Sequence, residues 1–336
     1  MKKKLLSALL CAAMIASLVI GCGSKEEPAA EVPAATEEAE TPAEEEVAAP
    51  AEDEENYETG DASLDNTRNQ DEIGENELLV VSFGTSFNDN RRLTIGAIEE
   101  KIEAAFPEYA VRRGFTSQII IDHVMSRDNV KIDNVTQALD RAVANGVKNL
   151  VVQPTLLMNG IEYEELTTTL AEYSDSFESV TVGEPLLTSD EDFQKVSAAI
   201  VDVTAEYDDG KTAIVFMGHG THHESNAVYA KMQTVLTEGG HKNYFVGTVE
   251  GSPMLEEVMP LVEAGGYERV VLRPLMIVAG DHANNDMAGL EEAGAWAYEF
   301  EAAGYEVVSV VEGLGQIEAI QELLVEHTQA AVDSAK

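Results

Sequence analysis

Three of the seven histidines in the chain lie within five residues of one another, directly after an apolar run. The run, Ala213–Met217, has the length of a short buried strand, and Gly218 and Gly220 let the backbone turn sharply at its end. His219 therefore stands at the carboxyl end of a predicted strand. In open α/β sheets this is the edge where ligands bind.

A second histidine, His282, follows a matching apolar run, Val270–Ala279. Neutral imidazole is a good ligand for divalent transition metals, and it also titrates near neutral pH. Two imidazoles presented from two strand ends therefore indicate either a metal site or proton transfer. His222 and His223, in the loop after the first strand, are either secondary metal contacts or exposed loop residues.

An internal repeat in the sequence indicates that a carboxylate lies near these histidines. The segment Val151–Pro154 resembles Val271–Pro274, and the positions correspond at a constant offset of 120, because 274 − 154 and 282 − 162 give the same number. Glu162 thus occupies in the first half the position that His282 occupies in the second. Related strand-end loops in two similar halves would bring Glu162, His219 and His282 to one cleft.

The elements that must position these side chains alternate regularly between strand and helix. Such alternation predicts an α/β protein of two similar lobes, about 77–208 and 209–332, each with a parallel sheet flanked by helices. The expected strands include Leu78–Ser82, Asn149–Val152, Ala213–Met217 and Arg269–Leu272, and the expected helices include Arg91–Phe106, Gln118–Ser126, Asp190–Tyr207, Ala288–Ala303 and Ile317–Ala331.

Composition excludes several classes of function. With 62 acidic and 21 basic residues, the net charge is −41, so nucleic acid is not expected as a partner. The two cysteines, Cys11 and Cys22, both precede the expected domain. The domain therefore has no disulfide, cysteine-ligated zinc site or cysteine nucleophile.

The first 22 residues have the features of a bacterial export signal. Lys2–Lys4 is followed by the apolar stretch Leu5–Ile20, which is short for a membrane span. The ending, Val19–Cys22, resembles a lipobox, in which cleavage precedes a lipid-modified cysteine. We therefore expect an extracytoplasmic protein anchored to the membrane by lipid on Cys22. The alternative is an ordinary cleaved signal peptide with a chance cysteine.

Residues 23–76 are rich in Glu, Ala and Pro and nearly free of large apolar side chains. Such a segment buries too little surface to offset the entropy of ordering, so the sequence predicts a disordered tether. The folded domain, 77–332, would then begin near Glu77, and deletion of the tether would leave its stability unchanged.

Six segments, in order along the chain, resemble the anaerobic sirohydrochlorin cobaltochelatases, which belong to the ATP-independent (class II) chelatases. They are Leu78–Ser86, Phe115–Ser117, Asn159–Glu164, Phe216–His223, Pro274–Gly289 and Gly313–Gly315. The resemblance implies two α/β lobes with a cleft, where a glutamate and two histidines face the metal. By motif these are Glu162, His219 and His282, and the two histidines are also the implied catalytic bases. The leader and tether depart from the cytoplasmic members of the family.

The resemblance implies a lyase that inserts Co²⁺ into the tetrapyrrole sirohydrochlorin in anaerobic cobalamin biosynthesis, without ATP or an organic cofactor. Fe²⁺ and Ni²⁺ remain open as alternative metals, and a homo-oligomer remains open. A different class of function also fits the leader, namely an extracytoplasmic lipoprotein that binds metal or a haem-like tetrapyrrole for uptake. Arg91, Arg92, Arg112 and Arg113 either meet substrate carboxylates or lie on a solvated surface.

Overall fold

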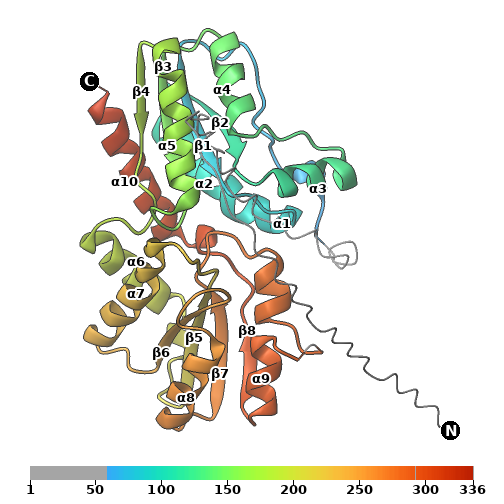
Figure 1. The fold of residues 1–336 in the computed structure, drawn as a ribbon, viewed down its shortest axis with the longest axis vertical. Helices are drawn as coiled ribbons and strands as arrows, with labels where there is room; N and C mark the ends of the chain where they lie inside the picture. The colour runs from blue at the N-terminus through green and yellow to red at the C-terminus, as the bar shows by residue number, and fades with distance from the viewer. Residues whose placement is uncertain (1–58, 292, 336) are drawn as a thin grey trace, which may run out of the picture. The chain divides into compact units, whose positions relative to one another are not determined.

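The computed structural model describes residues 59–291 and 293–335. Two four-stranded parallel sheets form its framework (Figure 1), in the orders β2-β1-β3-β4 and β6-β5-β7-β8. The first sheet comprises β1 (Asn76–Ser82), β2 (Ala110–Phe115), β3 (Asn149–Pro154) and β4 (Ser179–Val182). The second comprises β5 (Thr212–Gly218), β6 (Tyr244–Thr248), β7 (Arg269–Pro274) and β8 (Glu306–Ser309). The predicted α/β fold class is confirmed, and the identical strand order supports the internal repeat.

The central strands β1 and β5 carry the apolar runs that mark them in the sequence. Residues Glu77–Ser82 of β1 and all of β5 are buried. Helices cover parallel sheets on both faces, so alternation of apolar and polar residues is lost in such strands. Both strands lie between two parallel neighbours, which places the loops after β1 and β5 at the carboxyl edges of the two sheets.

The helices of the first half are α1 (Asn88–Arg91), α2 (Ala97–Ala105), α3 (Gln118–Asp128), α4 (Val135–Ala144), α5 (Ile161–Tyr173) and α6 (Asp190–Asp202). The predicted helix Arg91–Phe106 is interrupted by the π-helical turn Arg92–Gly96. The predicted helix Asp190–Tyr207 ends earlier, at Asp202. Side-chain caps fix two starts, since Asn134 pairs with Gln137 and Ser189 pairs with Asp192 in capping boxes.

The helices of the second half are α7 (Ala227–Glu238), α8 (Leu255–Gly265), α9 (Trp296–Ala302) and α10 (Glu318–Ser334). The predicted helix Ala288–Ala303 is wrong over its first half, because helical structure starts only at Trp296. Gly294 has a φ of +105°, which a continuous right-handed helix does not allow. A π-helical turn, Ala283–Met287, precedes this break and follows His282 directly.

The last helix of each half contacts the other half. α10 packs on α2, β3 and β4 of the first half, and α6 packs against α7 of the second (Figure 1). Thr204, just after α6, shares a buried hydrogen bond of 3.0 Å with Tyr244 of β6. One apolar core therefore runs through both lobes, from Val80 and Val151 to Ile214 and Val271.

The structure corrects the predicted extent of the tether. Residues 59–75, which we name the strap, pack against the first lobe, where Arg68 is buried and the Asp65 side chain is only 2% exposed. The composition of the strap resembles that of the residues before it, but two of its charged side chains, Asp65 and Arg68, pair with buried side chains of the domain. Residues 1–58, with the predicted signal segment 1–22, Cys22 and the rest of the tether, lie outside the described residues. Among the described helices, none has the length and apolar character needed to cross a membrane.

Candidate metal and tetrapyrrole site

A cavity of about 280 Å³ lies between the carboxyl edges of the two sheets. Its walls come from the loops after β1, β3, β5 and β7 and from the starts of α5 and α7. Apolar side chains such as Leu157, Met158 and Ile277 provide most of the surface, and hydroxyl groups of Ser82, Thr155 and other residues interrupt it. Among the described residues that line the cavity, none is lysine or arginine.

His219 follows β5 in this cavity, as the sequence predicts. Its Nδ1 lies 2.8 Å from the carbonyl oxygen of Gly220, which can only accept a hydrogen bond. Nδ1 is therefore the protonated ring nitrogen, and Nε2 carries the lone pair. The local backbone is fixed by Gly220, which has a φ of +84° and would place a Cβ 1.6 Å from the carbonyl oxygen of Glu250.

His282 lies beside His219, with the ring centroids 4.7 Å apart and the planes at 82°. Its Nδ1 donates to Asp286 Oδ2 at 2.6 Å, one helical turn further along. This bond raises the pKa of His282 above its usual 6.5 and outweighs the opposing effect of burial. The same bond leaves Nε2 as the nitrogen with a free lone pair. Two neighbouring imidazoles thus have the same tautomer.

Glu162 lines the same cavity, from the first turn of α5. Its charge acts on Tyr229, whose pKa rises to about 12, mainly through burial and in smaller part through Glu162. Among the described residues, the three-residue group with ligand atoms all within 4.8 Å is Asp281, His282 and Asp286. The structure therefore brings His219 and His282 into contact. Glu162 lines the cavity together with His219, His282 lies just outside its lining, and Glu162 does not join the compact group around His282.

Sequence reasoning missed two residues of this site. Asp286 orients His282, and its spacing of four residues on a helical segment is the signal that points to it. Tyr229 is 1% exposed, and its hydroxyl accepts a hydrogen bond of 3.2 Å from the Gly220 amide. Gly218 makes room for the Tyr229 ring, since a Cβ there would lie 2.1 Å from the Tyr229 Cε1 atom. The glycines of this strand end therefore serve close packing as well as turning.

Local geometry bears on two further predictions about individual residues. His223 Nδ1 accepts a hydrogen bond from the Ser225 amide at 3.2 Å, so its lone pair caps a turn. His222 is exposed. The sequence left two roles open for four arginines, contact with substrate carboxylates or a place on a solvated surface. Arg91, Arg112 and Arg113 have neither role, because all three are wholly buried. They meet carboxylates of the protein, with Asp65 and Glu99 as partners of Arg113.

Comparison with known proteins identifies the family. The family model for cobalt chelatase (CbiK) matches residues 76–333. The sirohydrochlorin cobaltochelatase of Salmonella typhimurium is 35% identical over 258 residues, which cover 77% of this chain and 97% of the relative. The chain belongs to the cobalt chelatase family. A second relative, sirohydrochlorin cobaltochelatase CbiKC of Nitratidesulfovibrio vulgaris, is 30% identical over 76% of this chain and 90% of its own length.

Solved structures support the chelatase fold. SirB from Bacillus subtilis, solved with Fe³⁺, superposes with a TM-score of 0.55 at 15% identity, over 77% of this chain and 97% of that one. DR2241 from Deinococcus radiodurans superposes with a TM-score of 0.51 at 18% identity, over 76% of this chain and 55% of that one. The cobalt chelatase match includes Glu162, His219 and His282 and begins at residue 76. The strap therefore precedes the part that defines the family.

Proposed function

We propose that this cobalt chelatase inserts Co²⁺ into sirohydrochlorin for anaerobic cobalamin biosynthesis, without ATP. The observation that carries the proposal is the contact between His219 and His282, whose Nδ1 atoms each meet an oxygen acceptor. Both Nε2 lone pairs are thereby available to a divalent ion. Both curated relatives described above act on the same substrate class, as their names state.

The Co²⁺ ion is a substrate, so it must be held and then released. Two neutral imidazoles and the Glu162 carboxylate supply three ligands of borderline and hard character, which suit Co²⁺ and also Fe²⁺ or Ni²⁺. Three protein ligands leave coordination positions open for the macrocycle nitrogens. The site contains no thiolate, which would bind a soft or borderline ion more tightly.

Proton transfer then completes the exchange. Two pyrrole N–H bonds break as two metal–nitrogen bonds form, so two protons must leave the macrocycle. Once the ion has moved, His219 and His282 each have a vacant Nε2 lone pair, and each accepts one proton. The raised pKa of His282 favours protonation of that imidazole. Most of the described residues that line the cavity are apolar, so we expect apolar contacts to contribute most of the binding of the macrocycle.

A direct assay tests this function. Purified protein is mixed with sirohydrochlorin and Co²⁺, and insertion is followed by absorbance, with Fe²⁺ and Ni²⁺ in parallel. His219→Ala and His282→Ala should each slow insertion about 100-fold or more, the typical contribution of a general base alone. His222→Ala is the matched control, because that histidine follows the same strand but does not line the cavity. Full activity of the double variant His219→Ala/His282→Ala would overturn the assignment, and tight tetrapyrrole binding without insertion would favour an uptake lipoprotein.

The location outside the cytoplasm is part of this proposal. The lipobox-like ending at Cys22 supports a lipid anchor that holds the enzyme on the outer side of the cytoplasmic membrane. Cys22→Ser should move the protein from the membrane fraction to the soluble fraction. Retention of the variant in the salt-washed membrane pellet would contradict the anchor.

A further inference from the structure

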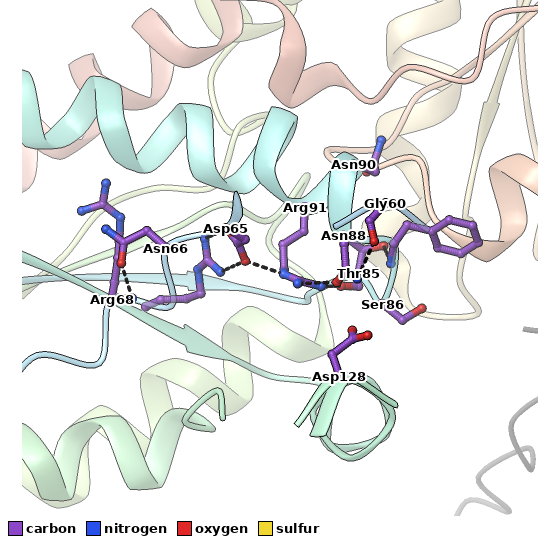
Figure 2. Close-up of polar contacts among 12 residues, drawn as sticks. Gly60, Asp65, Asn66, Arg68, Thr85, Ser86, Asn88, Asn90, Arg91 and Asp128 are labelled. Atoms are coloured by element: carbon purple, nitrogen blue, oxygen red, sulfur yellow. Dashed lines mark hydrogen bonds and ion pairs between the residues drawn. The ribbon is translucent and has the colours of Figure 1, made fainter. Parts of the chain in front are cut away.

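The strap forms a buried charge cluster with the first lobe (Figure 2). Asp65 accepts a hydrogen bond of 2.6 Å from Arg91 Nε. It also accepts from both terminal nitrogens of Arg113, at 2.7 and 3.0 Å. Both arginines are wholly buried. Arg113 also pairs with Glu99 through two bonds of 2.8 Å, but Arg91 has no other carboxylate among its described hydrogen-bond partners. Asp65 is therefore the counter-ion that Arg91 depends on.

Arg91 in turn holds the loop between β1 and α1, residues 83–87. Its Nη1 donates to the Thr85 carbonyl oxygen at 3.0 Å, and its Nη2 donates to Asn88 Oδ1 at 2.6 Å. The start of the strap adds backbone contacts, since Asp89 N donates to the Thr59 carbonyl at 2.8 Å. This loop begins with Phe83 and Gly84, which line the cavity. The strap thus holds, through Arg91, the loop 83–87 that forms one wall of the cavity.

The same region of the first lobe reaches across to the second. Asn90 Oδ1 accepts a hydrogen bond of 2.8 Å from the amide of Ala279, three residues before His282. Thr85 lies against Gly280, where an added Cβ would approach Thr85 Oγ1 to 3.1 Å. The segment that carries His282 is therefore held, across the cleft, by the loop and short helix that Arg91 organises.

We propose that Asp65 and Asn90 are positioning residues for the metal site. Asp65 fixes Arg91, Arg91 fixes the segment 83–91, and Asn90 at the end of that segment holds the peptide that leads to His282. The strap lies outside residues 76–333, which match the cobalt chelatase family model, whereas Asn90, Arg91 and His282 lie inside them. The inference rests on the proposed function only in assigning His282 as a ligand and base.

Hydrogen exchange of the Ala279 amide in the full-length chain tests the linkage without any activity measurement. Asp65→Asn keeps the side-chain volume but removes the charge. It should speed exchange at Ala279 about 3- to 10-fold, as Asn90→Ala should, because one neutral hydrogen bond is weakened or lost. Asp71→Asn is the matched control on the same strap, where Asp71 is exposed and pairs with Arg141 at 3.0 Å. Asn90→Asp keeps the acceptor oxygen and should retain protection.

Kinetics supply the second readout, measured at a temperature where every variant is folded. Asp65→Asn and Asn90→Ala should each lower kcat for Co²⁺ insertion about tenfold, with the KM for the tetrapyrrole changed less than about threefold. The double variant should lose little more than either single variant, because both act on one path. Asn90→Asp should recover most of kcat.

Three results would overturn the proposal. They are exchange at Ala279 in Asp65→Asn equal to that in Asp71→Asn, equal kcat in those two variants, or fully additive losses in the double variant. A wild-type protein that inserts no metal would instead refute the proposed function, and the exchange experiment would still decide whether the strap holds the His282 segment.

Discussion

The hydroxyl group of Tyr229 should contribute measurably to the free energy of unfolding of the protein. In Tyr229→Phe the ring that fills the space above Gly218 is retained, so no cavity forms. The Gly220 amide, 3.2 Å from that hydroxyl, loses its acceptor while it remains buried. The Gly220 backbone packs closely against Glu250, since even an added Cβ would lie 1.6 Å from the Glu250 carbonyl oxygen. A buried donor without an acceptor costs about 1–3 kcal/mol.

Urea denaturation at pH 7 measures this loss as a lower midpoint with an unchanged m-value. Tyr173→Phe is the control, because the Tyr173 hydroxyl bonds Asp140 on an exposed surface. Metal insertion should fall about tenfold in Tyr229→Phe, since His219 adjoins the loosened amide. The acid side of the pH profile should not move, because the pKa of Tyr229 is about 12 and the group stays neutral. Equal midpoints for the two variants would refute this account of the strand end.

Three further outcomes follow from the charges of the site and the strap. A chain that starts at residue 76 should be less stable than one that starts at residue 59 by about 3–5 kcal/mol, because Arg91 loses its buried partner Asp65, and thermal unfolding measures the difference. Burial alone would raise the pKa of Asp65, but its arginine partners hold that pKa below 3.8. The stability difference between the two chains should therefore persist above pH 3.8 and shrink in stronger acid. Equal stabilities of the two chains at pH 7 would count against this prediction. The hydrogen bond to Asp286 raises the pKa of His282, so the rate of metal insertion should fall as the pH drops through a value above 6.5. Asp286→Asn should move this fall in rate to lower pH. An unchanged pH profile in that variant would contradict the role of the hydrogen bond. Glu162→Gln should weaken Co²⁺ capture more than tetrapyrrole binding in separate absorbance titrations, and equal losses in both would argue against a metal ligand.

The parts that the sequence predicts well are those encoded by local pattern. The strand β5 and its glycine-flanked end can be recognised because burial on both faces requires a continuous apolar run. The constant offset between Glu162 and His282 reflects two copies of one βα unit, so each residue follows the equivalent strand. Their shared position at the sheet edges follows from topology. Their roles as ligands rest on the family resemblance and stay predictions.

The parts that the sequence does not predict depend on contacts between distant residues. Asp65 and Arg113 are 48 positions apart and meet only after the sheet has formed, so no periodic pattern marks them. From composition alone the strap is predicted to be part of the tether, because both segments are acidic and poor in large apolar side chains. The strap is distinguished by the pairing of Asp65 with buried arginines. The misplaced start of α9 has a local cause, since Gly294 carries a positive φ within an otherwise helical pattern.

The terminal helix of each lobe packs on the other lobe, and this sets the minimum length of chain that can fold alone. α10 covers the sheet of the first lobe, and α6 packs with α7 of the second, so neither half of the chain contains all of its own covering layer. A polypeptide equal to one lobe would expose the apolar face that the missing helix protects. Such a half-length protein would need a second copy to supply that helix.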